Sequence, residues 1–363
     1  MPLLSPFQSY TKLEKYIDGA WEEVKYWFGG SLVRRANSAS ILNITFPDWQ
    51  KQALVLRYGQ KVRFSFGLNG LPTTKAFLGR VTNRSHSEAP EQSWVSFECM
   101  DFLEQAQATQ VQLTETGYNF DGYDPSVAIK ELFDGLAGTP VTTTGVCGTN
   151  PKRLIVPADK IYFPDYSSAL AVALALNDLC WDDTAYPSYS LPYFLWQDGA
   201  GVIHHRKLKP LSSEAARTLT RGDSIAKGDV RSRAAHLINQ GSVAGGTDPF
   251  GVQVFASFGD NSRAAAYGAR GARASVSNLS SSDECKQWAI RKVQTQSLMS
   301  ETVKIETTKG YSLYPGDVVD AVDLVKRGSV KLRVTQVNLK FAPRAVSCEV
   351  ALGDSDFLAT EYV

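Results

Sequence analysis

Cysteine and histidine are scarce in this sequence of 363 residues, and their placement excludes several classes of protein. The five cysteines stand at positions 99, 147, 180, 285 and 348, and no C-x-x-C pair occurs. A disulfide framework and a zinc ribbon are therefore not expected. Cys99 and Cys348 fall in strand-like runs and are interpreted as small buried apolar residues, which fits folding in a reducing cytoplasm.

Sequence motifs of common catalytic sites are also missing. The four histidines form no H-E-x-x-H, and the G-x-S-x-G, P-loop and G-x-G-x-x-G patterns do not occur. These absences disfavour a zinc protease or an α/β-hydrolase and leave no nucleotide-binding fingerprint.

The chain has little excess charge and no long apolar segment. Its 38 basic and 37 acidic residues leave a net charge of +1, which gives no sign of a nucleic-acid or membrane partner. The longest apolar run, Ala169 to Leu176, is far too short to span a membrane, and Met1 to Lys15 lacks the features of a signal peptide. With 43% hydrophobic and 21% charged residues, the composition is that of a soluble globular protein, and the length predicts two to four domains.

The first hundred residues carry the signals of a β domain. Asp18-Gly19 stands between apolar residues and predicts a hairpin. A helix from Thr11 to Phe28 is the rival interpretation, because apolar residues there approach helical spacing, but Gly19 would weaken its interior. Strands are predicted over 38–46 and 62–66, with Asn69-Gly70 as a turn, and about six strands are expected by Met100, enough for a small barrel or sandwich.

A compact α+β unit is predicted after Asp101. Asp124-Pro125 is typical of a helix start, and Ser167 or Ser168 is expected to cap a second helix that runs through Cys180. The glycines around Asp198 predict a hairpin that begins at Tyr193 and ends at His205.

The last third of the sequence predicts a second β domain. Lys209 to Val230 is expected to be an exposed connection, and Asn261 to Ser282 a long loop. Ser282-Asp283-Glu284 is expected to open a third helix, because acidic residues are favoured in a first turn. Strands are predicted at Val252 to Phe258 and Thr302 to Thr307.

The closing hairpin, Lys331 to Gly353, repeats a pattern found at Phe77 to Met100. Arg80-Val81-Thr82 matches Arg333-Val334-Thr335, and Val95-Ser96-Phe97-Glu98 matches Val346-Ser347-Cys348-Glu349, with a two-residue difference assigned to the hairpin turn. Each copy follows a turn, Tyr58 to Val62 or Tyr314 to Val318. We interpret the repeat as an internal duplication; the alternative is that Val, Thr and Ser alternate in any half-buried hairpin.

The densest group of basic residues is His204-His205 with Arg206, Lys207 and Lys209. The two imidazoles are adjacent in a strand and face opposite sides, so they cannot share a metal ion. A solvated strand end is preferred over a phosphate site. His86, assigned to the hairpin turn, and His236 are interpreted as surface residues.

Other candidate residues have stronger structural interpretations. The pairs Asp182-Asp183 and Asp121/Asp124 have the type that glycosidases use, but Asp124 is assigned to a helix cap. Arg221-Gly222-Asp223 matches an adhesion tripeptide that recurs by chance. The aromatic residues of Trp181 to Trp196 could bind carbohydrate, but they more often fill a core or a subunit interface. No active site is expected.

Several short motifs follow one another in a distinctive order. They are Tyr16 to Trp21, Tyr58 to Val62, Phe77 to Val81, Asp101-Phe102-Leu103, the helices at 126–136 and 168–180, the hairpin at 198–202, Tyr267-Gly268, the helix at 283–293, and Leu313 to Val318. In this order they resemble the tail-hub, or baseplate hub, proteins of tailed bacteriophages. That family includes late control protein D and is related to the N-terminal part of type VI secretion spike proteins. The resemblance covers most of the chain.

The resemblance implies a mainly β, α+β fold with two related tail-tube-like β-barrel or sandwich domains separated by a smaller α+β domain. The expected domains are 1–105, 106–208 and 209–363, the last with an inserted loop and a helix at 282–298.

The function implied is that of a structural virion protein without enzymatic activity, cofactor or metal. Three copies would form a pseudo-hexameric ring that joins the tail tube to the central spike or tip and lets DNA pass. The partners implied are the tail tube or distal tail protein, the spike or tip protein and the tape measure protein, in a virion tail assembled in the host cytoplasm. The long loops at 138–150 and 261–282 are candidate contacts with neighbours. The alternatives are a glycan hydrolase of the tail tip, using carboxylates near Trp181 to Trp196, or a carbohydrate- or receptor-binding tail module.

Overall fold

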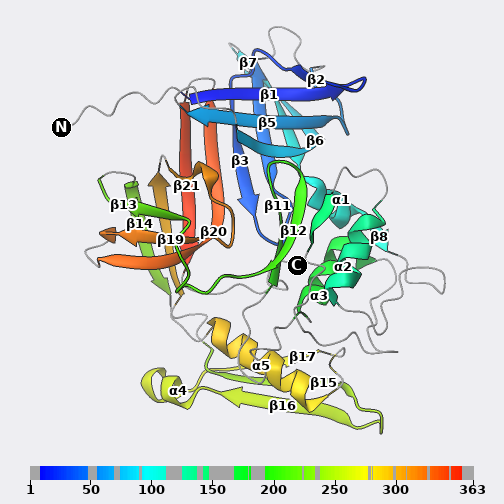
Figure 1. The fold of residues 1–363 in the computed structure, drawn as a ribbon, viewed down its shortest axis with the longest axis vertical. Coiled ribbons are helices and arrows are strands. Elements are labelled where there is room, and N and C mark those ends of the chain that lie inside the picture. Colours follow the sequence, from blue (N-terminus) through cyan, green and yellow to red (C-terminus); the bar gives the residue numbers. More distant parts are fainter. Residues whose placement is uncertain are drawn as a thin grey trace.

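The computed structural model describes residues 9–47, 55–68, 74–89, 92–111, 125–136, 142–146, 167–178, 180, 193–222, 225–233, 238–276, 279, 281–296, 300–307, 309–324, 328–342 and 345–353. Within these ranges, strands dominate and thirteen of them form one sheet, with most helices packed beside or below it (Figure 1). The chain is a mainly β protein of the α+β class, as predicted. No described helix is both long and apolar enough to cross a membrane.

The first β unit is an antiparallel sheet built from the front of the chain. Asp18 (φ 48°) and Gly19 (φ 90°) form the turn between its first two strands, so the hairpin prediction is confirmed and the rival helix is wrong. Leu13, which alternates with polar residues along the first strand, is buried. The strands are β1 (Ser9–Ile17), β2 (Ala20–Glu23), β3 (Gly29–Arg35), β4 (Ile41–Pro47), β5 (Lys61–Leu68), β6 (Thr74–Ala89) and β7 (Gln92–Met100).

The second β unit is built from six strands of the last third of the chain. The prediction of an exposed connection over Lys209 to Val230 is wrong, because β13 and most of β14 lie there. In these strands Leu219 and Ile225 are buried among mostly polar neighbours, too few apolar residues to signal a strand by periodicity. The strands are β13 (Arg217–Thr220), β14 (Ile225–Arg233), β18 (Ser300–Thr307), β19 (Val318–Val322), β20 (Ser329–Ala342) and β21 (Ala345–Gly353).

Each β unit contains a turn of the same kind, before β5 in the first unit and before β19 in the second. The N–H of Gly59 donates to the carbonyl of Val81 (2.9 Å), and the N–H of Gly316 donates to that of Val334 (2.8 Å). Both glycines have positive φ, at 73° and 87°, a conformation that residues with a side chain avoid. The turns therefore correspond through their glycines rather than through their tyrosines.

Both hairpins also carry a β-bulge at a threonine. The pairing register shifts at Thr82 in β6 and at Thr335 in β20. The hydroxyl of Thr82 donates to the carbonyl of Glu98, and that of Thr335 to Ala351, each over 3.2 Å. Bulges are specific local features, so their recurrence with the same hydrogen bond supports common ancestry over chance.

The predicted match of the second strands is wrong by two residues. Each pair of the β6–β7 hairpin has a counterpart 253 residues later in the β20–β21 hairpin, so the two turns have equal length. Val95 corresponds to Cys348 rather than to Val346. Because side chains in a strand alternate with a period of two, a two-residue slip keeps every residue on its face and escapes detection by pattern.

The correspondence extends to whole units. The strand order in the first is β3-β4-β7-β6-β5-β1 and in the second β14-β18-β21-β20-β19-β13. Only the last pairing differs, since β1 is antiparallel to β5 whereas β13 is parallel to β19. The duplication prediction is confirmed over six strands, while the domain boundaries at 105 and 208 stay predictions.

The middle unit contains the predicted helices and hairpin. Asp101 caps a further helix, α1, that was not predicted: its carboxylate accepts from the N–H of Leu103 (3.1 Å) and of Ser40 (2.8 Å), and burial raises its pKa to about 7. The hydroxyl of Ser168 accepts from the N–H of Ala171, which confirms that cap. The elements are α1 (Phe102–Ala108), β8 (Gln110–Val111), α2 (Pro125–Asp134), β9 (Thr142–Val146), β10 (Ser167–Ser168), α3 (Ala169–Asp178), β11 (Tyr193–Gln197) and β12 (Val202–Lys207).

A small layer of strands with a helix across it is inserted between β14 and β18 (Figure 1). The prediction of a long loop over Asn261 to Ser282 is wrong, since the carboxylate of Asp260 caps one helix and β17 adds a parallel strand to β15. The third helix starts at Ser282 as predicted, with Ser281 and Glu284 capping each other's N–H groups. The elements are β15 (Gln240–Thr247), β16 (Gln253–Gly259), α4 (Asn261–Tyr267), β17 (Gly271–Ser275) and α5 (Ser282–Gln296); a short 3-10 turn, η4 (Gly310–Ser312), precedes β19.

Four of the cysteines, including Cys99 and Cys348, are buried and free, as interpreted from the sequence. The Asn69-Gly70 turn, the Asp124 cap and Cys147 lie outside the described residues.

Candidate assembly surfaces

The two β units are joined by a seam in which β3 pairs with the second half of β20. Six residue pairs form it, from Gly30 opposite Phe341 to Arg35 opposite Gln336, all antiparallel. One continuous hydrophobic core runs beneath the seam and contains residues of both units, Leu32 and Leu339 among them. The units therefore form one body.

Arg34 connects the units from inside this seam. Its side chain is buried, and the guanidinium donates to the carbonyls of Tyr311 (2.8 Å), Leu313 (2.9 Å) and Ala76 (3.3 Å). It also lies 4.3 Å from the ring centroid of Tyr314. Tyr311 and Leu313 belong to the second unit and Ala76 to the first, so one side chain holds backbone of both.

Aromatic rings fill the seam beside Gly30. The ring of Phe341 stacks on Phe64 at 4.1 Å and meets Trp27 edge-on at 5.7 Å. A β-carbon placed on Gly30 would lie 2.1 Å from the carbonyl oxygen of Asn43 and 2.8 Å from the Phe341 ring. Only glycine fits this position without movement of its neighbours.

The β11–β12 hairpin of the middle unit packs against both β units. The N–H of Leu195 donates to the side-chain oxygen of Asn37 (2.9 Å). Gln197 accepts from the N–H of Phe102 (2.7 Å) and donates to the carbonyl of Leu78 (2.8 Å). On the other side of the hairpin, the ring of Trp196 contacts that of Tyr314 of the second unit in a tilted arrangement, with ring centroids 4.5 Å apart. The middle unit thus fixes the relative position of the two β units.

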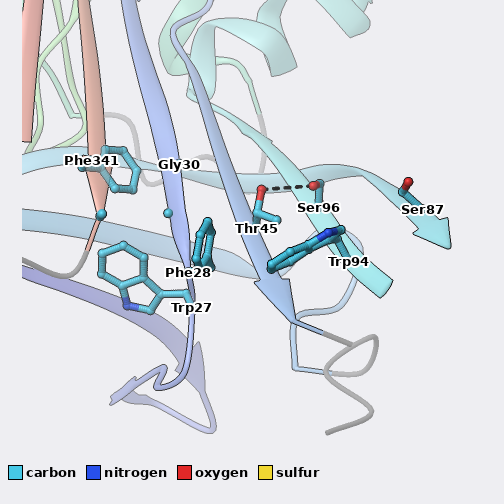
Figure 2. Close-up of a pocket in the computed structure, with 10 residues that line it drawn as sticks. Trp27, Phe28, Gly30, Thr45, Ser87, Trp94, Ser96 and Phe341 are labelled. Carbon is cyan, nitrogen blue, oxygen red and sulfur yellow. Dashed lines mark hydrogen bonds between the residues drawn. The ribbon is translucent and has the colours of Figure 1, made fainter. Parts of the chain in front are cut away.

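An apolar hollow of about 930 Å³ opens at one end of the seam (Figure 2). Phe28, which is 62% exposed, faces Trp94 across it with ring centroids 5.1 Å apart. Its floor carries few polar groups, and Thr45 and Ser96 are hydrogen-bonded to each other at 3.1 Å. Trp27, Gly29, Gly30, Ser87, Phe341 and Ala342 complete the lining.

Several strands have no strand beside them on one side within the described part of the chain, among them β14 and the second half of β6. Apart from one isolated bridge between Ile225 and Arg221, β14 pairs with β18 alone and ends the sheet order. The second half of β6, Asn83 to Glu88, pairs only with β7, and all its residues are exposed. The counterparts of Arg84 and His86 in β20 are Val337 and Leu339, and both are buried at the seam.

The structure places the two adjacent histidines on opposite faces, as predicted. His204 is half-buried, lies 3.0 Å from the carboxylate of Asp198 and stacks on Trp196 at 4.4 Å. His205 is fully buried, and its Nε2 lies 2.8 Å from the side-chain oxygen of Asn177. No group of side chains suited to a metal ion occurs in the ranges described.

The basic residues after the histidines are engaged in structural contacts. Arg206 lies over the ring of Trp196 at 4.8 Å, and the carbonyl of Lys209 accepts from Arg333 at 2.6 Å. Arg206 and Lys209 are exposed, which fits the solvated strand end, and the preference for it over a phosphate site stays a prediction. Lys207 is the last residue of β12.

The other sequence candidates divide into described and undescribed residues. Tyr193 and Trp196 are buried, as in the core interpretation, and Arg221 and Gly222 are exposed. His86 is exposed but lies in β6 rather than in the hairpin turn, because that strand runs to Ala89. The remaining candidates lie outside the described residues: Asp121, Asp124, Trp181, Asp182, Asp183, Tyr186, Tyr189, Asp223 and His236.

Sequence reasoning missed Arg34, Asn37 and Gln197, the polar residues that join the units. Each is buried and bonded to backbone of another unit, Gln197 through the carbonyl of Leu78. Local patterns carry no sign of such partners, since polar residues at strand ends are usually exposed.

His205 is expected to make stability fall on acidification. Burial lowers its pKa from 6.5 to about 3, so between these values the unfolded chain binds a proton that the folded chain does not. Stability contributed by the neutral imidazole is therefore present above about pH 6.5 and lost as pH falls toward 3, by about 1.4 kcal/mol per pH unit. His205→Gln keeps a donor toward Asn177 but does not titrate.

Denaturant unfolding of both proteins from about pH 7 to about pH 4 checks this expectation. The difference in unfolding free energy between wild type and His205→Gln should change across this range in favour of the variant. The buried Asp101 is present in both proteins, so its own titration cancels. Parallel curves would show that His205 is accessible to protons in the folded state.

No family model matches the chain, and no curated protein matches its sequence. Solved structures do match. A tail protein from Neisseria meningitidis MC58 superposes with a TM-score of 0.66 at 13% identity, over 96% of this chain and 98% of that one. The 43 kDa tail protein of prophage MuSo2 from Shewanella oneidensis gives 0.65 at 12% identity, over 95% and 98%.

The prophage tail protein gp18 from Listeria monocytogenes EGD-e gives a TM-score of 0.62 at 10% identity, over 97% of this chain and 96% of that chain. At these identities the likeness establishes the fold. The chain has the fold of phage tail proteins, which the order of sequence motifs predicted.

Proposed function

We propose that this chain is a structural tail protein of a phage-like particle, the hub of its baseplate or tail tip. Three copies close into a ring with six tube-like positions. The ring joins the hexameric tail tube, or a distal tail protein, to a three-fold central spike or tip protein. The tape measure protein and then DNA pass through its lumen. The protein is located in the virion tail and assembles in the host cytoplasm.

The observation that carries this function is the repeat of two six-stranded β units in one chain, whose central hairpins correspond residue for residue. Two equivalent units per chain and three chains give six equivalent positions around an axis, which suits a six-fold neighbour on one side and a three-fold neighbour on the other. The fold shared with tail proteins from three prophage or bacterial sources adds to this support.

A structural role is favoured over the glycan hydrolase. Of the aromatic segment that a hydrolase would use, Tyr193, Phe194 and Trp196 are buried, and Trp196 packs against Tyr314 of the second β unit. Neither enzymatic activity nor a cofactor belongs to the proposed role. The receptor-binding alternative has no separate support from the described surface.

The oligomeric state tests the proposal. Sedimentation of the purified chain at increasing concentration is expected to show a species of three times the 39.8 kDa of one chain. Negative-stain images of that species should show a ring with a central hole about as wide as a DNA duplex. A monomer up to the solubility limit, or a closed assembly of another number of chains, would contradict the hub function.

A further inference from the structure

Within the described part of the chain, β14 and the second half of β6 each have an edge without a strand neighbour. We propose that Asn83 to Glu88 of one copy pairs antiparallel with Gly228 to Arg233 of the next copy, in the register that β20 and β3 use within the chain. This inference rests on the proposed ring and specifies how its copies join.

The seam inside the chain supplies the template. It joins β20 of the second unit to β3 of the first. By the repeat, β20 corresponds to β6 and β3 corresponds to β14. Continuing the same junction from one copy to the next therefore brings β6 of one chain against β14 of another. These are strands that carry an open edge.

The register follows from the residue correspondences. Gly30 pairs with Ile44, and Gly228 pairs with Ile305, so the two glycines correspond. Gly30 lies opposite Phe341, whose counterpart in β6 is Glu88. Glu88 therefore lies opposite Gly228 of the next copy. The remaining pairs are Ser87 with Asp229, His86 with Val230, Ser85 with Arg231, Arg84 with Ser232, and Asn83 with Arg233.

The composition of β6 fits an edge that must be soluble before assembly. Where β20 carries the buried Val337 and Leu339, β6 carries the exposed Arg84 and His86. Polar and charged residues on an open edge discourage unspecific strand pairing. Pairing through main-chain hydrogen bonds does not need apolar side chains, so the edge can still accept the one strand that matches its register.

Cysteine cross-linking tests the register with four single substitutions, which are combined in pairs in two different ways. Ser85→Cys with Arg231→Cys and Ser87→Cys with Asp229→Cys place the thiols opposite each other. Ser85→Cys with Asp229→Cys and Ser87→Cys with Arg231→Cys use the same four substitutions two residues out of register, roughly 7–8 Å apart. The wild-type chain, whose described cysteines are buried, controls for background oxidation.

After mild oxidation of the sedimenting trimer, the in-register variants are expected to run mostly as covalent dimers and trimers on a non-reducing gel. No larger species should form, because a closed ring has no free end. The out-of-register variants should cross-link only in a small fraction of chains.

The outcomes separate this inference from the function it rests on. A trimer whose in-register and out-of-register variants cross-link equally, or not at all, overturns the register and leaves the hub function standing. A ladder beyond the trimer overturns closure of the ring through these edges. A chain that stays monomeric overturns the hub function and this inference together.

Discussion

Replacing Arg34 by methionine is expected to lower the free energy of unfolding by about 3 kcal/mol, because charge-assisted hydrogen bonds to buried carbonyls contribute about 1.5–3 kcal/mol each. The guanidinium donates to Tyr311, Leu313 and Ala76 from both sides of the seam, and methionine leaves those oxygens unpaired in the core. The loss of the contact with Tyr314 adds to the effect. Chemical denaturation followed by fluorescence measures the change.

Arg35→Met is the matched control. Arg35 is the next residue of β3 and is exposed, so its replacement is expected to change stability by less than about 0.5 kcal/mol. Equal effects of the two substitutions would mean that the buried hydrogen bonds of Arg34 do not hold the two β units together.

Gly30→Ala is expected to cost about 3 kcal/mol, the upper part of the range for overpacked cores. The added methyl group would meet the carbonyl oxygen of Asn43 at 2.1 Å and the ring of Phe341 at 2.8 Å, so β3 must move away from β4 or β20. Since both neighbours are sheet partners of β3, the substitution would also disturb the seam between the two β units, and it is expected to weaken the proposed trimer. Thermal unfolding and sedimentation measure the two effects.

Gly271→Ala is the control for this substitution. Gly271 lies in a strand at a negative or extended φ, and the nearest atom to an added β-carbon is 4.0 Å away. Its replacement should leave stability unchanged or raise it slightly, because alanine restricts the unfolded chain. A Gly30→Ala protein as stable as Gly271→Ala would show that the seam opens readily.

The sequence predicts the local features of this fold better than its connections. Asp18-Gly19 and Ser168 act through neighbours a few residues away, so their turn and cap were predicted correctly. β13 and β14 were missed because each depends on a distant strand for pairing and shows few apolar residues of its own.

The repeat was found through its hairpins, but its alignment was wrong in the second strand. Matching letters favoured Val95 with Val346, whereas the shared bulge and the equal turn fix Val95 to Cys348. A strand pattern constrains which face a residue occupies and leaves shifts by two undetermined.

The joining residues could not be predicted at all. Arg34 has the local surroundings of an exposed strand residue, and its partners lie at positions 311 and 313. Nothing in a single sequence couples positions so far apart, because the pairing arises only when the tertiary structure forms.

The seam also sets an order of events during synthesis. β3 emerges early, but its partner β20 is made some three hundred residues later. Their pairing closes one of the longest loops in the chain, and it can form only late in synthesis. Until then the β3 edge of a nascent first unit is open. Because β3 corresponds to β14, this edge could pair with β6 of a completed copy in the register proposed for β14. Under the proposed assembly, chain folding and ring formation therefore compete for equivalent edges. Slow release of the C-terminal hairpin would favour mispaired, open-ended chains over closed rings.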